Sequence, residues 1–265
     1  MNMSKPYTFT PSFPDGTLSR ASATQSIGVE VLHGLRSLPR RGDSCLPTCL
    51  KTPSNMDAPA TPPLEVGVAS LMLQGQNESG DQYVVAPFPG GVLVAVVDGL
   101  GRGREASNAA RIAVGTLKNS PFEHVIHLLL RCHLNLQTTR AAAMSIASFN
   151  ALNGTMTWLG VGSVEGALIR SNPRKTRNEL LFRSRGMVGS VLPSMRAHMT
   201  SICHGDTLIL ATDGIRSEFL DDLALKAAPQ KSAEDILANH ARATDEALVL
   251  VVRYLGVELS QTEKN

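Results

Sequence analysis

The chain has 265 residues, of which 43% are hydrophobic and 18% are charged, and its formal net charge is +2. This length and composition predict a globular protein with one substantial core, and the weak charge argues against nucleic acid or a membrane surface as the main partner. The apolar runs are shorter than the ~18 residues of a membrane helix and the start lacks a secretory signal pattern, so we expect a cytoplasmic protein.

The amino-terminal part of the chain differs in composition from the rest. Residues 1–63 are rich in proline, serine and threonine, which predicts a mostly disordered leader. Within it, Ile27, Val31 and Leu35 recur at helical spacing and predict one short amphipathic helix over Ser26–Leu38. We expect a single folded domain over residues 64–256 and a polar tail over residues 257–265.

The domain has the pattern of a chain rich in strands. The predicted strands are Val66–Leu73, Gln82–Phe88, Val92–Val97, Ala141–Phe149, Thr155–Val161, Glu165–Arg170, Glu179–Phe182, Thr207–Thr212 and Ala247–Tyr254. The predicted helices are Arg104–Leu117, Pro121–Leu136, Ile215–Ala227 and Ser232–Arg242, the last with Ser232 as its N-cap. Successive strands joined by short turns indicate antiparallel pairing, so we expect an α+β fold in which helices cover antiparallel sheets.

Carboxylates mark the ends of three predicted strands. Asp98 follows the unbroken apolar run Val92–Val97, Asp213 follows Thr207–Thr212, and Asp245 comes shortly before the last strand. If these ends meet in space, oxygen ligands from distant parts of the chain form a site for a hard divalent cation. Asp-Gly is also a common hairpin turn, but the residues after Asp98-Gly99 and Asp213-Gly214 are helical in pattern rather than typical of a returning strand.

Glycines at alternate positions after Asp98 admit a second interpretation. Gly99, Gly101 and Gly103 invite comparison with a dinucleotide-binding loop, but Arg104 stands where the last glycine of that motif is required. No series of alternating strands and helices follows, and there is no Walker lysine. A nucleotide-binding enzyme is therefore the weaker alternative.

Five short motifs resemble the metal-dependent PPM-type (protein phosphatase 2C-like) serine/threonine phosphatases, in their bacterial SpoIIE/RsbX-like branch. The resemblance covers about Leu64–Gly256 and rests on the order and spacing of these motifs. They are Ser79–Asp81, Val97–Gly103, Thr157–Gly162, Ala211–Ile215 and Thr244–Leu248.

The resemblance implies an α-β-β-α sandwich, two packed antiparallel sheets flanked by helices, with two Mn²⁺ or Mg²⁺ ions at one edge. It implies that Asp98 bridges the ions, that the Gly99 carbonyl adds an oxygen, and that Asp213 and Asp245 are the remaining direct ligands. Asp81 would hold water around the ions or a third, looser ion. Such ions activate water and neutralise charge on phosphate, with Asp98 and Asp213 as the catalytic carboxylates.

The chain departs from the family pattern at two places. Arg102 stands where the branch usually has histidine; arginine cannot donate a proton near neutral pH, but its fork of donors can bind phosphate. Glu246 and Leu248 replace a second aspartate and a threonine in the closing motif. These departures motivate a second alternative, a catalytically weak pseudo-phosphatase that binds its partner.

The sequence therefore predicts a phosphatase that removes phosphate from serine or threonine of a partner protein. By resemblance, the partner would be a STAS-domain antagonist or scaffold in a bacterial stress-response or sigma-factor partner switch. Basic residues are also concentrated between Arg170 and Arg185, which predicts a solvated loop or, alternatively, a docking surface for an acidic or phosphorylated protein.

Overall fold

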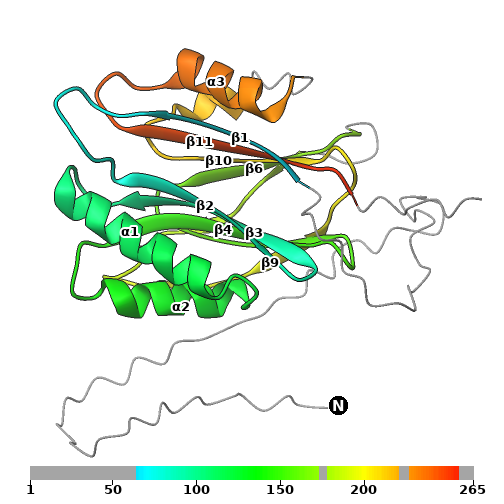
Figure 1. Ribbon diagram of the computed structural model, residues 1–265, viewed down its shortest axis with the longest axis horizontal. Coiled ribbons are helices and arrows are strands. Elements are labelled where there is room, and N and C mark those ends of the chain that lie inside the picture. The colour runs from blue at the N-terminus through cyan, green and yellow to red at the C-terminus, as the bar shows by residue number, and fades with distance from the viewer. Residues whose placement is uncertain (1–63, 173–177, 221–226, 257–265) are drawn as a thin grey trace, which may run out of the picture.

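The computed structural model describes residues 64–172, 178–220 and 227–256 of the chain. These residues form four layers, a helix, two sheets and a helix pair (Figure 1). The strands are β1 (Leu64–Leu71), β2 (Asp81–Phe88), β3 (Gly91–Gly99), β4 (Ala142–Asn150), β5 (Thr155–Val161), β6 (Glu165–Ile169), β7 (Glu179–Leu180), β8 (Arg183–Ser184), β9 (His198–Ser201), β10 (Thr207–Ala211) and β11 (Ala247–Tyr254). The helices are α1 (Arg104–Asn119), α2 (Val125–Leu136), α3 (Pro229–His240) and the 3₁₀ turn η1 (Ser217–Leu220).

The two sheets differ in strand order and share one core. The first sheet has the order β1-β11-β10-β6-β7, and the second has the order β2-β3-β4-β5-β8, with β9 also pairing with β5. Apart from the short parallel pairing of β5 with β8, the strand pairings of the described residues are antiparallel. The predicted α-β-β-α sandwich is confirmed.

Strand β3 shows why its sequence is apolar without alternation. Val92, Val94 and Val96 pack between the two sheets. Leu93 and Val97, on the opposite face, pack under α1 and α2. A strand buried on both faces needs apolar side chains at every position, whereas a strand with one wet face alternates.

The helices cover the outer faces of the sheets. Helix α1 buries an alanine-rich face on the second sheet beside α2, and α3 lies on the first sheet (Figure 1). Among the described residues, no helix is both long and apolar enough to cross a membrane.

Several predicted boundaries are corrected by the structure. Helix α3 begins at Pro229, so Ser232 is a buried residue inside the helix rather than its N-cap. Helix α2 begins at Val125, after His124, instead of at Pro121. Of the helix predicted over residues 215–227, the described part contains only the η1 turn. The predicted leader with its short helix, and the polar tail, lie outside the described residues.

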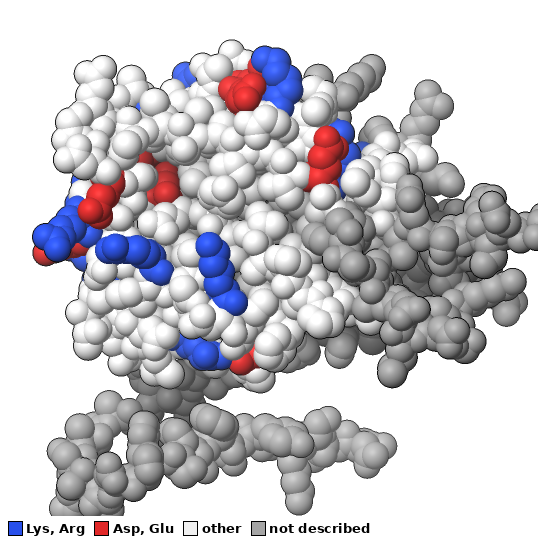
Figure 2. Space-filling view, viewed as in Figure 1, with Lys and Arg blue, Asp and Glu red and all other residues white. Residues whose placement is uncertain are grey.

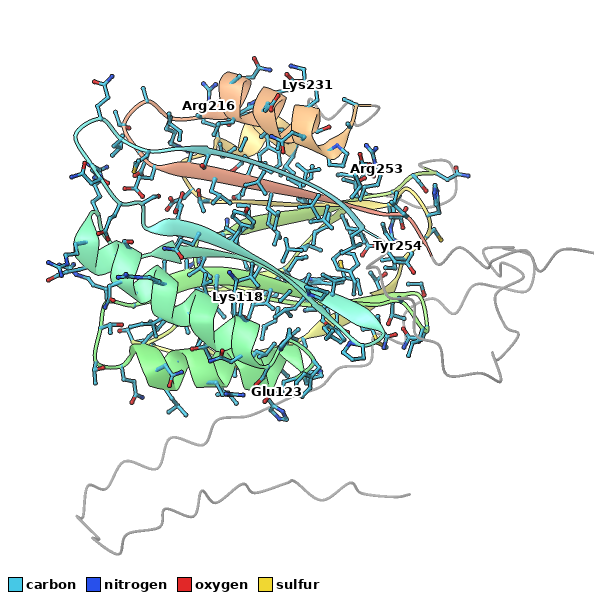
Figure 3. All side chains as sticks on the ribbon, in the orientation of Figure 1. Lys118, Glu123, Arg216, Lys231, Arg253 and Tyr254 are labelled. Atoms are coloured by element: carbon cyan, nitrogen blue, oxygen red, sulfur yellow. The ribbon has the colours of Figure 1, made fainter. Side chains whose placement is uncertain are left out.

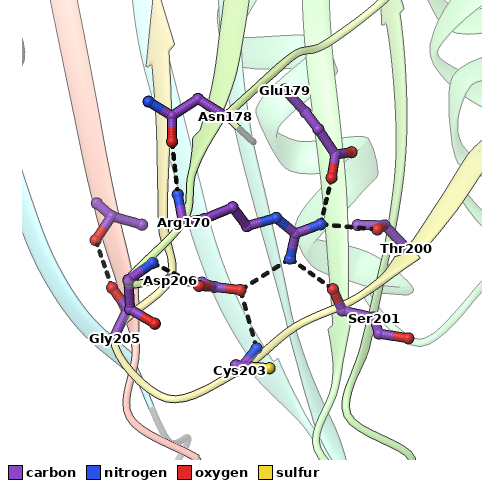
Figure 4. Close-up of polar contacts among 10 residues, drawn as sticks. Arg170, Asn178, Glu179, Thr200, Ser201, Cys203, Gly205 and Asp206 are labelled. Carbon is purple, nitrogen blue, oxygen red and sulfur yellow. Dashed lines mark hydrogen bonds and ion pairs between the residues drawn. The ribbon is translucent and has the colours of Figure 1, made fainter. Parts of the chain in front are cut away.

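A buried ion-pair cluster joins the sheets at one end of the sandwich (Figure 4). Arg170, which follows β6, contacts Asp206 at 2.9 Å and also pairs with Glu179 of β7. The same guanidinium donates to the Ser201 carbonyl at 2.8 Å and the Thr200 hydroxyl at 3.0 Å, both on β9 of the second sheet. Arg170 is therefore a structural residue, while residues 173–177 of the predicted basic loop lie outside the described part of the chain.

Candidate metal and active site

Acidic residues from both sheets meet at the end of the sandwich opposite Arg170. Asp81 begins β2 and is the direct cross-strand partner of Asp98 near the end of β3. In the first sheet, Asp213 comes two residues after the end of β10, and Asp245 comes two residues before β11. The strand register therefore places all four carboxylates at one edge.

Strand alternation decides which side chains face the other sheet. Asp98 is two residues after Val96 and shares its inward face, and Asp81, as the cross-strand partner of Asp98, lies on that face too. By the same alternation, Thr212 continues the face of Leu210, and Glu246 that of Leu248.

Hydrogen bonds link the two sheets at this end. The Thr212 hydroxyl donates to Asp81 Oδ2 at 2.7 Å and accepts from the Leu248 amide at 2.9 Å. Glu246 Oε2 accepts from the Ser79 hydroxyl at 2.6 Å and from the Gly80 amide at 2.7 Å. Residues of the first sheet thus hold Asp81 and the loop that precedes it.

Close backbone packing at the site requires glycine at two positions. A Cβ at Gly99 would lie 2.2 Å from the Ala106 carbonyl oxygen, so glycine lets α1 pack against the end of β3. A Cβ at Gly214 would lie 1.7 Å from the Glu246 carbonyl oxygen. The glycines after Asp98 and Asp213 therefore allow neighbouring backbone to approach these aspartates.

Burial and neighbouring negative charges raise the pKa of two of the carboxylates, Asp81 and Asp98. Burial and the charge of Asp98 raise the pKa of Asp81 to about 8, against the bond from Thr212. Burial and the charge of Asp213, with smaller contributions from Asp245 and Glu246, raise the pKa of Asp98 to about 7, against a 3.1 Å bond from the Ser163 hydroxyl. Like charges directly opposite in a sheet are destabilising, so this site favours a bound cation.

Arg102 lies at the rim of the acidic group. Its guanidinium donates to the Thr244 carbonyl at 2.9 Å and lies 3.5 Å from Asp245 Oδ1. The side chain is 57% exposed, so part of its fork of donors remains open to solvent. An arginine in this position can receive an anion that approaches the carboxylate edge.

The oxygen ligands at this edge suit a hard cation that keeps part of its water shell, rather than one that is held entirely by side chains. In the described residues, no three histidine, cysteine or acidic side chains form a ready-made metal cluster. Mg²⁺ usually keeps several waters and takes only one or two carboxylates, so a cluster of three is not required. Glu246 Oε1 is buried without a hydrogen-bond partner among the described residues, which agrees with a site whose oxygens outnumber its donors. The residues therefore fit Mg²⁺ or Mn²⁺.

We expect added Mg²⁺ to raise the melting temperature more at pH 8 than at pH 6. In metal-free protein the pKa values of Asp81 and Asp98 are higher in the folded state than in the unfolded state. Their contribution to folding stability is therefore fully present below pH 3.8, the ordinary aspartate pKa, and is lost as the pH rises to about 8. A cation must displace these protons, so its affinity falls by about tenfold per pH unit for each proton displaced. Differential scanning fluorimetry checks this, and equal shifts at both pH values, or shifts retained by Asp98→Asn, would contradict it.

The structure brings together all the residues predicted for the site: Asp81, Asp98, Gly99, Arg102, Asp213 and Asp245. The prediction did not include the hydroxyls of Thr212 and Ser163 or the anchoring role of Glu246. Strand alternation from Leu210 and Leu248 could have found Thr212 and Glu246. Ser163 lies in a turn after β5, where no periodic pattern identifies its partner.

Comparisons with known proteins agree with this geometry. Residues 89–256 match the family described as Stage II sporulation protein E (SpoIIE). The phosphoserine phosphatase RsbX of Bacillus subtilis (strain 168) is 26% identical over 148 residues, which is 56% of this chain and 73% of RsbX.

Solved structures show the same fold. A crystal structure of RsbX in complex with magnesium has a TM-score of 0.65 and 21% identity, covering 72% of this chain and 94% of that one. A structure from work on the bacterial stressosome, a modular system adapted to control secondary messenger signalling, has a TM-score of 0.65 and 24% identity, covering 72% of this chain and 99% of that one. The chain belongs to the SpoIIE family of PPM-type (protein phosphatase 2C-like) phosphatases.

Proposed function

We propose that this metal-dependent phosphatase binds two Mn²⁺ or Mg²⁺ ions through Asp98, Asp213, Asp245 and the Gly99 carbonyl. The observation that carries this proposal is the meeting of four carboxylates from both sheets at one edge, where burial and the charge of Asp213 raise the pKa of Asp98 to about 7. Asp98 would be the ligand shared by the two ions, because it is close enough to both Asp213 and Asp245 for their charges to raise its pKa. Asp81, bonded to Thr212, is the candidate for a third ion or for surrounding water.

The residues of the chain have separate roles in the proposed reaction. The ions, when bound, would lower the pKa of a water and neutralise charge that develops on the phosphate. Ser163 and Thr212 orient Asp98 and Asp81 through their hydroxyl groups. Arg102, held by Thr244 and Asp245, would bind a phosphate oxygen through its exposed donors and would not transfer a proton.

The proposed substrate is a phosphorylated serine or threonine of a partner protein. RsbX is a phosphoserine phosphatase, and other neighbours of this fold come from stressosome and RsbU-RsbW proteins. We therefore propose a phosphoprotein of a partner-switching pathway, with a STAS-domain antagonist or scaffold as the specific candidate. A cytoplasmic location is part of the same proposal.

Hydrolysis of a phosphoserine peptide tests the proposal directly. We expect phosphate release with Mn²⁺ or Mg²⁺, loss of at least 95% of the rate with excess chelator, and recovery when metal is restored. We expect Arg102→Ala to lower kcat/KM by about tenfold, because one charged hydrogen bond to the phosphate is lost. A wild-type rate that is insensitive to chelator would exclude the metal-dependent mechanism.

Two alternatives, a pseudo-phosphatase and a nucleotide-binding enzyme, are less well supported. A pseudo-phosphatase would bind a partner without hydrolysis, but the complete acidic edge and the family membership favour an active enzyme. A nucleotide-binding enzyme would require the parallel sheet of a dinucleotide fold, whereas β3 pairs antiparallel with both of its neighbours.

A further inference from the structure

We propose that the outer face of α1 docks an acidic segment of the phosphoprotein substrate and thereby contributes to substrate choice. The inference rests on the proposed function and extends it to a surface outside the acidic site. Three features of the described residues support it: a basic stripe along α1, a hollow beside the start of that helix, and the continuity of both with the loop after Asp98.

The basic stripe consists of Arg104, Arg111 and Lys118. These residues are seven positions apart, and 3.6 residues per turn bring them close to one line along the helix, about 21 Å from first to last at 1.5 Å per residue. All three are exposed, and none forms an ion pair with another described residue. Figure 2 shows blue side chains spaced along the α1 layer.

A hollow of about 690 Å³ lies beside the first half of the stripe. Its lining comes from α1 and from the loop between α2 and β4: Arg104, Glu105, Asn108, Arg111, Thr138, Thr139 and Arg140. Glu105 is the acidic residue of this lining, and its carboxylate is occupied by Arg140 at 2.6 Å. Among the described residues, the hydrogen-bond partner of the Arg111 side chain is the neutral Asn108 amide oxygen, at 3.2 Å. The hollow therefore has an excess of positive charge and several polar groups that can bind carboxylates.

The hollow is continuous with the loop that follows Asp98. Arg140 Nη1 would lie 3.5 Å from a Cβ at Gly101, and the Leu100 amide donates to the Ala141 carbonyl at 2.8 Å. Arg104, the first residue of the stripe, comes two positions after Arg102, whose guanidinium contacts Asp245. A phosphoserine at the acidic edge would therefore have its flanking residues directed toward the hollow and the stripe.

The chemistry of the surface favours an acidic protein segment. Helix α1 itself presents no exposed aromatic side chain on which a nucleic-acid base could stack and no exposed large apolar side chain that could enter a membrane. The exposed side chains of Leu100 and Phe122 lie in the loops before and after the helix. Complementary charge at the rim of an interface mainly accelerates association and sets partner choice, and it weakens with added salt. The stripe is thus expected to change KM and to leave the chemical step unchanged.

The test uses two phosphoserine peptides of equal length, one flanked by six glutamates and one by six glutamines, together with p-nitrophenyl phosphate. Wild type is expected to prefer the acidic peptide by about tenfold in KM at 50 mM salt, and the preference should shrink at 500 mM. The charge-reversal variant Arg111→Glu/Lys118→Glu should lose the preference and keep its kcat on p-nitrophenyl phosphate. Lys231→Glu is the control for charge reversal elsewhere, because Lys231 is also exposed but lies on α3, on the far side of the sandwich, where it pairs with Asp235 (Figure 3).

Fluorescence anisotropy with labelled peptides separates this inference from the proposed function, because it requires no hydrolysis. Tighter binding of the acidic peptide by wild type than by the double variant would support docking even if the protein were inactive. Equal affinities, or an acidic preference that survives the double substitution, would overturn the inference. Stripe-dependent binding of a single-stranded oligonucleotide in preference to the acidic peptide would also overturn it.

Discussion

Asp98→Asn is expected to lower kcat for a phosphoserine peptide by about 10³-fold or more while the fold remains intact. The amide keeps the shape of the side chain and its contact with Ser163 but removes the negative charge at the centre of the acidic edge. Removing one preorganised hydrogen-bond donor at a reacting centre typically costs about 10²–10³ in kcat, and losing a charged metal ligand should cost at least as much because metal binding is also weakened.

The same substitution makes an opposite prediction for stability. Asp98 has its pKa raised to about 7 by burial and by neighbouring carboxylates, so metal-free wild type carries unfavourable repulsion at pH 8. Metal-free Asp98→Asn should therefore melt at the same or a higher temperature than wild type at that pH. Asp235→Asn, at an exposed aspartate on α3 that pairs with Lys231, is the matched control; it should leave activity unchanged and lower the melting temperature only slightly. An Asp98→Asn protein with more than one tenth of wild-type kcat would contradict the assignment.

Asp206→Ala is expected to lower the free energy of unfolding by about 3–5 kcal/mol. The Asp206 side chain is 3% exposed and that of Arg170 is 6% exposed, so the substitution leaves a buried guanidinium with one carboxylate partner fewer. Removing one member of a buried ion pair typically has a cost of this size, and here the remaining carboxylate, that of Glu179, is 34% exposed and compensates the buried charge only in part. Asp206 also accepts from the Cys203 and Ser171 amides, whose hydrogen bonds are lost together with the charge.

Urea denaturation followed by circular dichroism measures this change. Asp235→Ala, which breaks the exposed pair with Lys231, is the control and should cost less than about 1 kcal/mol. The double variant Arg170→Met/Asp206→Ala should recover part of the loss, since it also removes the buried guanidinium and leaves only the partly exposed Glu179 without its partner. A loss below about 1 kcal/mol for Asp206→Ala would show that the cluster of Figure 4 does not make a large contribution to the stability of the fold.

The long elements of the fold could be predicted because their patterns are local. The apolar run of β3 and the alanine-rich face of α1 each indicate one type of element and one buried face. Strands β8 and β9 were not predicted because two and four residues are too short to show alternation, and their pairing with β5 depends on distant contacts. The start of α3 was placed too late, because Pro229 at its first turn is a better start signal than Ser232.

The site was only partly accessible to sequence reasoning. Carboxylates at strand ends, with glycine next to two of them, identify the acidic edge without any knowledge of the pairing between strands. Strand pairing makes Asp81 the direct neighbour of Asp98, and the packing of the two sheets lets the Thr212 hydroxyl bond to Asp81. Thr212 and Asp81 are more than 100 positions apart in the sequence, so no local pattern could reveal their contact.

Charges attract one another at one end of the sandwich and repel one another at the other, so we expect the two ends to differ in how readily they unfold locally. At the Arg170 end, opposite charges attract within the first sheet and Arg170 also donates hydrogen bonds to β9 of the second. At the acidic end, like charges repel and only a few hydrogen bonds oppose them. Amide hydrogen exchange in metal-free protein should therefore be slow near Asp206 and fast near Asp81. Bound cations would reverse the repulsion, so the protein can keep its global fold through cycles of metal loss while the order of its catalytic edge follows the metal supply.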